Sequence, residues 1–239
     1  MLFRSNSFDF SIENELLRRG AKRLVLLDVD STLIQQEVID LLGARTEHKE
    51  QIIEITSRAM KGELTFDEAL RARVALLKGL SADVLDDVRA EISLSPGART
   101  LIRTLHHLGH KVGIVSGGFS DVIAPLAEEL KLDFVLANKL EVLDGYLTGN
   151  VVGEIVNRER KARALREFAA REKIDIAQTV AVGDGANDLE MLKLAGVGIA
   201  FNAKPILRDS ADASISNPYL DSVLYLLGIT REEVTQALL

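Results

Sequence analysis

The chain repeats short apolar runs rich in β-branched residues, and most of them are separated by stretches with the spacing of an amphipathic helix. The runs cover 23–28, 111–116, 133–137, 179–184, 196–201 and 212–215. Strands that are apolar at every position are typical of a sheet covered on both faces. With helical segments such as 97–108 and 161–172 between them, these runs predict an α/β fold with a doubly wound, Rossmann-like parallel sheet.

One segment interrupts this alternation. Between about Gln36 and Ser95 the sequence shows only helical periodicity, with breaks near Gly43, Gly62, Gly79 and Ser81. A stretch of about sixty residues is too long for a loop without structure of its own. We therefore predict a helical cap domain, 36–95, inserted into a core domain made of 1–35 and 96–239. Separately, Asp144-Gly145 stands between two alternating runs and predicts a β-hairpin.

The composition limits the kinds of partner. Hydrophobic residues make up 47% of the 239, enough to fill an interior. The net charge is -7 and no basic block stands out, so the protein would repel a nucleic acid or an anionic membrane. The absence of cysteine excludes disulfides, a thiolate nucleophile and thiolate zinc sites.

The sequence also bears on location. No run is apolar over the roughly eighteen residues that a membrane-spanning helix needs, and the start of the chain lacks the pattern of a signal peptide. We expect a cytoplasmic protein with a small-molecule partner, and we infer no nucleic acid, membrane or protein partner.

Polar residues follow three of the predicted strands, at the edge of the sheet where ligands of open parallel sheets bind. These groups are "DVDST" from Asp28, "SGG" from Ser116 and "GDGAND" from Gly183. Asp28 and Asp184 would converge there, and two carboxylates about 4 Å apart repel by roughly 4 kcal/mol at an effective dielectric constant of 20. A cation is therefore expected between them. Oxygen ligands without histidine or cysteine favour Mg²⁺.

The second group predicts a phosphate site. Ser116 offers a hydroxyl, and Gly117 and Gly118 offer backbone N–H groups where a helix is expected to begin, near Phe119. Lys161, on a helix expected to begin near Asn157, adds positive charge. The ligand predicted from these groups is a phosphoryl group.

In their order along the chain, "DVDST", "VSGG", Lys161 and "GDGAND" resemble the four motifs of the haloacid dehalogenase-like phosphatase superfamily. The resemblance implies that Asp28 is a nucleophile that forms an aspartyl phosphate. It implies that Asp30 protonates the leaving oxygen and then deprotonates the attacking water. Ser116 and Lys161 would hold phosphate oxygens.

The same resemblance assigns the metal site. Asp28, Asp184 and the backbone carbonyl of Asp30 would bind the magnesium. Asn187 would point towards the phosphate. Asp188 would support the site indirectly, through Lys161 or the metal waters.

The predicted cap carries two charges that suggest a substrate. At about 100° per residue, Arg73 falls within the apolar stripe formed by Phe66, Leu70 and Leu77, and Glu37 lies beside an apolar run. A carboxylate, a guanidinium and a phosphate site complement a ligand with ammonium, carboxylate and phosphate groups, as in O-phospho-L-serine. Alternatively, Arg73 forms a structural ion pair with Glu63 or Glu37.

Longer stretches, "AMKGELTFDEALRARVALLKGL", "LTGNVVGEIV" and "IAFNAKPILRDSAD", resemble the phosphoserine phosphatase family within that superfamily. By this resemblance Glu37 binds the substrate ammonium and Arg73 its carboxylate, while Met60 and Phe66 form an apolar wall and Gly117 contacts the substrate. The implied reaction releases L-serine and phosphate, a step of serine biosynthesis. No amino-terminal regulatory domain is expected.

Two alternatives stay open from the sequence. The substrate could instead be phosphohomoserine, phosphothreonine or a nucleotide, hydrolysed by the same chemistry with another leaving group. The chain could instead be a non-enzymatic switch that holds phosphate on Asp28, although an acid at Asp30 would shorten the life of such a phosphate.

Overall fold

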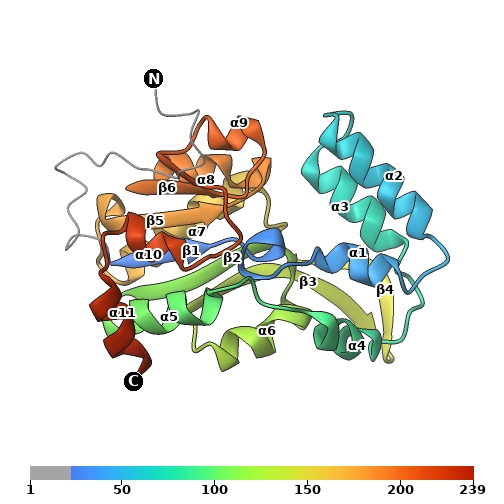
Figure 1. Cartoon of the computed structure of the whole chain (residues 1–239). Coiled ribbons are helices and arrows are strands. Elements are labelled where there is room, and N and C mark those ends of the chain that lie inside the picture. The colour runs from blue at the N-terminus through green and yellow to red at the C-terminus, as the bar shows by residue number, and fades with distance from the viewer. Residues whose placement is uncertain (1–22) are drawn as a thin grey trace.

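The core of the protein is a seven-stranded sheet with the order β4-β3-β2-β1-β5-β6-β7 (Figure 1). The computed structural model describes residues 23–239, so the part of the predicted core at 1–22 lies outside the described residues. Neighbouring strands are parallel except β3 and β4. The predicted doubly wound sheet is therefore confirmed. Its strands are β1 (Leu24–Leu27), β2 (Lys111–Phe119), β3 (Phe134–Leu143), β4 (Tyr146–Val152), β5 (Thr179–Gly183), β6 (Val197–Phe201) and β7 (Ala213–Ile215).

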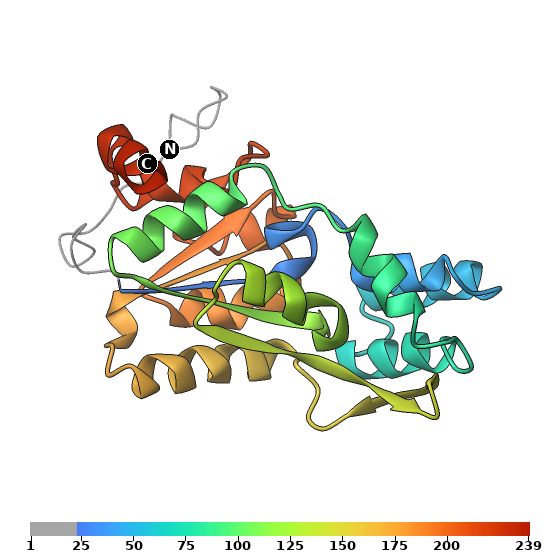
Figure 2. The same ribbon diagram turned by 90° about the horizontal axis from the view of Figure 1, so that it is seen from below.

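Helices cover both faces of the sheet, which explains why its central strands are apolar throughout. In β1, Leu24 and Leu26 pack towards one face and Val25 and Leu27 towards the other. Figure 2 shows α5 and α7 on opposite sides. The first face carries α7 (Arg158–Arg171), α8 (Leu189–Leu194) and α9 (Pro205–Arg208). The second carries α5 (Ala98–His107), α6 (Ser120–Glu129), α10 (Ser222–Leu226) and α11 (Arg231–Leu238). No helix of residues 23–239 has the length and apolar character to cross a membrane.

The stretch between β1 and α5 is helical, as its periodicity predicts, and lies beside the sheet at the end where β1 stops (Figure 1). It contains α1 (Val38–Gly43), α2 (Lys49–Met60), α3 (Phe66–Ala75) and α4 (Val84–Glu91). Gly62 and Gly79, two of the predicted breaks, have φ of +77° and +87°, which favours glycine. Thr65 and Glu68 form a reciprocal capping box that starts α3. We call 36–95 the helical insertion.

The predicted hairpin is present between β3 and β4. Asp144 and Gly145 both have positive φ, +51° and +82°, as a two-residue turn of this kind requires. The hairpin also reaches the helical insertion: Gly79 N–H donates to the Leu147 carbonyl (2.8 Å), and Leu147 N–H donates to the Leu80 carbonyl (2.9 Å). The antiparallel arm of the sheet thus binds the insertion through its backbone.

Candidate active site

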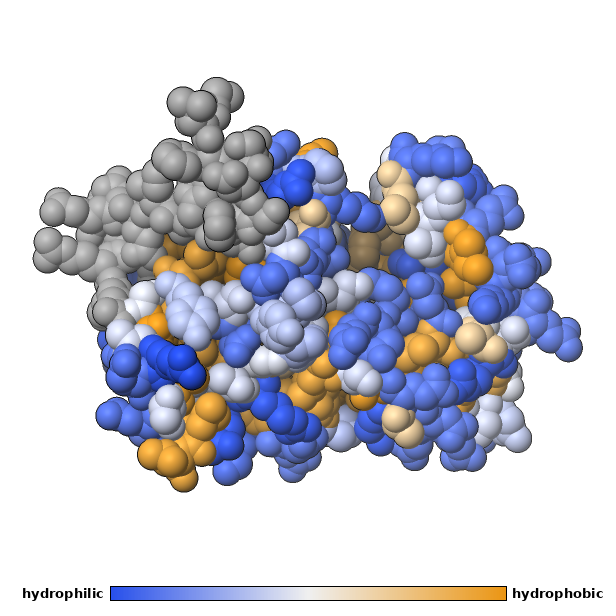
Figure 3. Space-filling view, in the orientation of Figure 1, coloured by the Kyte–Doolittle hydropathy of each residue, from blue (hydrophilic) through white to orange (hydrophobic). Residues whose placement is uncertain are grey.

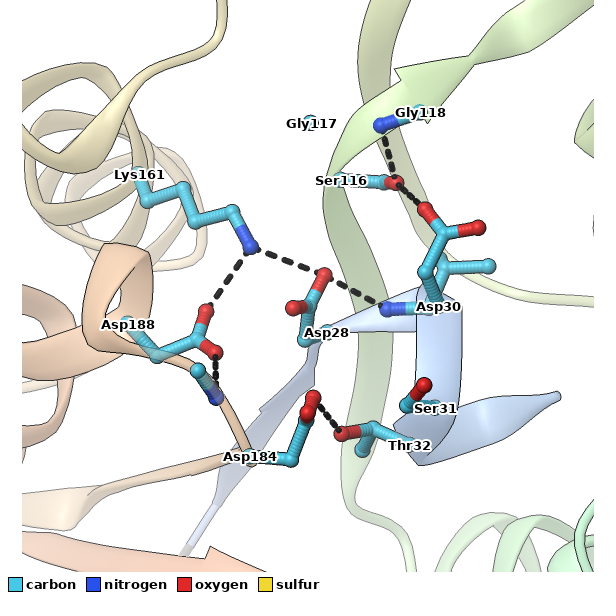
Figure 4. A network of polar contacts seen from close by, with 12 residues as sticks. Asp28, Asp30, Ser31, Thr32, Ser116, Gly117, Gly118, Lys161, Asp184 and Asp188 are labelled. Atoms are coloured by element: carbon cyan, nitrogen blue, oxygen red, sulfur yellow. Dashed lines mark hydrogen bonds and ion pairs between the residues drawn. The ribbon is translucent and has the colours of Figure 1, made fainter. Parts of the chain in front are cut away.

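The sheet register brings the predicted site residues to one edge. Leu27, the last residue of β1, pairs with Ile114 of β2 and Val182 of β5. Asp28 follows directly, and its own N–H donates to the Val182 carbonyl (2.9 Å). Ser116 and Asp184 each lie two residues beyond these partners. Three stretches far apart in sequence therefore meet beyond the centre of the sheet (Figure 4).

At the bottom of the site a lysine lies between two aspartates. Lys161 Nζ, from the first turn of α7, is 2.8 Å from Asp28 Oδ1 and 2.8 Å from Asp188 Oδ1 (Figure 4). The Lys161 and Asp188 side chains are fully buried and Asp28 nearly so. Burial by itself lowers the pKa of Lys161, but Asp188 and Asp28 raise it above its usual value. The lysine is therefore charged, and the predicted contact between Asp188 and Lys161 is present.

A third carboxylate completes an acidic cluster. One oxygen each of Asp28, Asp184 and Asp188 lies within 4.8 Å of the others. Thr32 Oγ1 donates to Asp184 Oδ1 (3.0 Å). Burial and the charge of Asp188 raise the pKa of Asp184 to about 6. Burial, then Asp188 and Asp184, raise the pKa of Asp28 well above its usual value, against the effect of Lys161.

This donor set suits a divalent metal ion. Three carboxylates gather here and the Lys161 ammonium pairs with two of them, which leaves negative charge uncompensated in a largely buried place. All the acidic donors are hard oxygen ligands, and Asp184 keeps an oxygen that Thr32 does not occupy. A divalent cation would compensate the charge, and hard oxygen donors are the ligands that such ions as Mg²⁺ prefer.

A second acid lies on the other side of Asp28. Ser116 Oγ donates to Asp30 Oδ2 (3.2 Å), and Val38 N–H donates to Asp30 Oδ1 (2.8 Å). Burial raises the pKa of Asp30, although the Val38 amide opposes it. The tight coil of 29–33, in which Ser31 has φ +56°, turns Asp30 back towards β2. Asp30 thus lies beside Asp28, and its carboxyl group is protonated more readily than that of an exposed aspartate.

The helix that follows the glycine pair begins where it was predicted, because α6 starts at Ser120 with Phe119 as its N-cap. The strand before it is longer than predicted: β2 continues through Gly117 and Gly118 to Phe119, which pairs with Asn138 of β3. Gly118 N–H donates to Ser116 Oγ (2.8 Å). The physical reason for glycine here is close approach, since a Cβ on Gly118 would lie 2.5 Å from Asp30 Oδ2.

Two residues of the helical insertion, Glu37 and Phe66, also contact this site. Ser31 Oγ donates to Glu37 Oε1 (2.7 Å). Loss of water around Glu37 and the charge of Asp30 raise the pKa of Glu37 to about 7. The ring tip of Phe66 lies over Gly117, because a Cβ there would be 2.7 Å from Phe66 Cζ. Glu37 thus lies beside Ser31 and Asp30, and Phe66 lies over Gly117.

Met60 and Arg73 lie farther out. Met60 is 64% exposed, and its Sδ is 3.8 Å from Nζ of Lys204, which precedes α9 of the core. Figure 3 shows a hollow between the helical insertion and this part of the core. Arg73 Nη1 donates to Thr56 Oγ1 (3.4 Å) and Arg73 Nε to the Ala69 carbonyl (3.2 Å).

The alternative of a structural ion pair for Arg73 is wrong. Glu63 pairs with Arg58 (3.2 Å), and Glu37 accepts the Ser31 hydroxyl. Within residues 23–239, no carboxylate lies within ion-pair distance of Arg73. Burial lowers the pKa of Arg73, although Asp40, Glu37 and Asp30 oppose this from a distance. Its guanidinium keeps donors for a ligand.

Several contacts of the site carry no clear signal in the sequence. Asn138, from β3, is buried and donates to the Gly117 carbonyl (2.8 Å) while accepting the Val156 N–H (2.8 Å). Only its position as a polar residue within a strand could have marked it. Thr32 could have been inferred from its place in "DVDST". Asn187, predicted to face phosphate, folds its amide Oδ1 over Gly185 within the loop.

Comparison with known proteins agrees with this architecture. Residues 25–193 match the model of the haloacid dehalogenase-like hydrolases, and the chain belongs to that family. Within it, the chain is 58% identical to the phosphoserine phosphatase of Streptomyces coelicolor and to phosphoserine phosphatase SerB2 of Mycobacterium tuberculosis, in each case over 96% of this chain. The chain spans 56% of the length of each of those two relatives.

Shorter relatives are matched over nearly their whole length. The phosphoserine phosphatase of Streptococcus thermophilus is 51% identical over 86% of this chain and 96% of its own. A solved phospho-aspartyl intermediate analogue of a phosphoserine phosphatase superposes with a TM-score of 0.81 at 43% identity, covering 85% of this chain and 98% of that one. A substrate-bound phosphoserine phosphatase gives a TM-score of 0.81 at 42% identity, covering 85% and 97%. The resemblance predicted from the sequence is confirmed.

Proposed function

We propose that this chain hydrolyses O-phospho-L-serine to L-serine and inorganic phosphate, through an aspartyl phosphate on Asp28. The observation that carries the proposal is the buried contact of Lys161 with Asp28 and Asp188, with the Asp30–Ser116 pair beside it. The phosphoserine phosphatases it resembles support the substrate. We infer a cytoplasmic reaction, a step of serine biosynthesis.

In the first step, a carboxylate oxygen of Asp28 attacks phosphorus, and the bond between phosphorus and the serine oxygen breaks. Asp28 Oδ1 is held by Lys161 and by the Val29 N–H (2.7 Å), so the carboxyl group has a fixed orientation. Asp30 donates a proton to the leaving oxygen. Its raised pKa, caused by burial, favours the protonated form that this step needs.

In the second step, water attacks the phosphorus of the aspartyl phosphate. Asp30 is now ionised and accepts a proton from that water, and the bond between phosphorus and the Asp28 oxygen breaks. Phosphate leaves and Asp28 is regenerated. Throughout, the Lys161 ammonium and the Ser116 hydroxyl stabilise the charge of the phosphoryl oxygens.

We propose that Asp28, Asp184 and the Asp30 carbonyl hold Mg²⁺, with Asp188 supporting Lys161. When bound, the ion would neutralise carboxylate and phosphoryl charge. The raised pKa of Asp184, caused by burial and by Asp188, supports a role for a cation there.

The helical insertion would recognise the serine part. The Glu37 carboxylate is suited to the substrate ammonium, and Arg73 is suited to its carboxylate, because its guanidinium is not paired with a carboxylate among residues 23–239. Phe66 and Met60 would form the apolar wall between them, and Gly117, beneath the Phe66 ring, would contact the substrate. Asn187 would approach the phosphate from the Gly185 side.

A phosphate-release assay tests the proposal. Phosphoserine, phosphothreonine, phosphohomoserine and a nucleoside monophosphate are compared, each with Mg²⁺ or EDTA, for the wild type and Asp28→Asn. We expect phosphoserine to be preferred, Mg²⁺ to be required, and Asp28→Asn to lose at least about 10⁴-fold in kcat. An active Asp28→Asn variant would overturn the mechanism. Preference for another phosphomonoester would overturn the substrate alone, and a long-lived phosphoenzyme in the wild type would favour the switch.

A further inference from the structure

Arg73 depends on one side-chain contact for its orientation. Its Nε donates to the Ala69 carbonyl of its own helix (3.2 Å), which fixes only the base of the guanidinium. Its Nη1 donates to Thr56 Oγ1 of the neighbouring helix α2 (3.4 Å). Among the described residues this is the one hydrogen bond that Arg73 makes to another side chain. The Thr56 hydroxyl therefore limits rotation of the guanidinium.

The charges around Arg73 make that limit important. Asp40 on α1, Glu37 and Asp30 all act on Arg73 electrostatically without forming an ion pair. A guanidinium free to rotate would turn towards these carboxylates, because an unpaired, partly buried cation gains from any nearby anion. Arginine binds a carboxylate best through two parallel hydrogen bonds, which require the guanidinium plane to be aligned in advance.

We propose that Thr56 is a positioning residue that sets the selectivity of the site for phosphorylated amino acids over phosphorylated amines. Its hydroxyl holds Arg73 away from Asp40 and Glu37, with its remaining N–H donors directed to a substrate carboxylate. The proposal rests on the proposed function, in which Arg73 meets that carboxylate. Thr56 itself touches neither the substrate nor the reacting atoms.

The test compares Thr56→Val, which removes the hydroxyl and keeps the shape, with Thr56→Ser, which keeps the hydroxyl. Kinetic constants are measured for phosphoserine and for phosphoethanolamine, which has the ammonium and phosphate but no carboxylate. For Thr56→Val we expect KM for phosphoserine to rise about fivefold to tenfold, since a hydrogen bond to a charged group is lost, with kcat nearly unchanged. Thr56→Ser, which keeps the hydroxyl, should have a KM for phosphoserine close to that of the wild type. In both variants kcat/KM for phosphoethanolamine should stay near the wild-type value. Ser57→Ala, on the exposed side of α2, is the matched control.

A double-mutant cycle with Arg73→Ala gives a second measurement that needs phosphoserine alone. In the Arg73→Ala background, Thr56→Val should have almost no further effect, because there is no guanidinium left to orient. Equal losses on both substrates, or additive losses in the cycle, would mean that Thr56 only stabilises the insertion and would overturn the proposal. If Arg73→Ala itself leaves phosphoserine turnover unchanged, the recognition part of the proposed function fails, and the role of Thr56 fails with it. If Arg73→Ala is impaired with phosphoserine and Thr56→Val is not, the positioning role of Thr56 is excluded and the role of Arg73 stands.

Discussion

The two sides of the site are built differently. On the core side, Lys161 and Asp188 are fully buried, and the contacts of Lys161 with Asp28 and Asp188 are both 2.8 Å. On the insertion side, the Arg73–Thr56 hydrogen bond is 3.4 Å long, and Met60 is 64% exposed. The core side joins the ends of strands in a packed sheet, whereas the insertion side consists of helices with one wall open to solvent.

The difference indicates a division of work. Groups that stabilise charge during phosphoryl transfer must be held in place before the reaction, and burial among strand ends does this. Groups that recognise the leaving part of the substrate must admit it from solvent and release it afterwards. We therefore expect core variants to affect every phosphomonoester alike and insertion variants to affect phosphoserine in particular.

The largest effect is expected at Lys161. In Lys161→Met, Asp28 and Asp188 would remain buried without their counter-charge, so unfolding free energy measured by urea denaturation in EDTA should fall by about 3 to 5 kcal/mol. The control is Lys193→Met, whose partner Glu190 is 4.0 Å away in an exposed pair, where we expect less than about 1 kcal/mol. Equal stability losses in the two variants would show that the buried contacts of Lys161 contribute no more to folding than an exposed ion pair does.

Arg73 tests the insertion side. Arg73→Ala should lower kcat/KM for phosphoserine by a factor that corresponds to about 2 to 5 kcal/mol of transition-state free energy. This is the usual cost of removing the partner of a buried charge. Phosphoethanolamine should be affected far less. Arg71→Ala, on the exposed face of the same helix, serves as the control. A loss of equal size for both substrates would show that Arg73 belongs with the core groups.

The smallest effect is expected from the titration of Glu37. Its pKa of about 7 means that the carboxylate is ionised above that pH and progressively neutral below it. The proposed attraction of Glu37 for the substrate ammonium would therefore be present at high pH and lost as the pH falls through about 7. Dividing kcat/KM of the wild type by that of Glu37→Gln removes the titration of the phosphate itself, and we expect this ratio to drop several-fold between pH 8 and pH 6. A flat ratio would remove Glu37 from recognition.

The sequence predicts the sheet, the helical nature of the insertion and the hairpin, because each follows from local periodicity and turn chemistry. The convergence of Asp28, Ser116 and Asp184 was predictable as well, since parallel strands end at one edge. The roles of Asn138 and Thr56 were not. Each depends on which side chain packs opposite it, Gly117 for Asn138 and Arg73 for Thr56. The extension of β2 through Gly117 and Gly118 was not predicted either, because sequence alone does not show that the strand continues there and passes close to Asp30.

The backbone pairing of Gly79 and Leu80 with Leu147, together with the bridge between Ser81 and Tyr146, has a consequence for truncation. β4 is the outermost strand of the sheet at that end, and residues 79–81 cover the free edge at its start. Excising the helical insertion would leave unpaired N–H and C=O groups there, which are a template for pairing with another molecule. A miniaturised chain without the insertion is therefore expected to aggregate along this exposed margin before any change in substrate preference could be measured.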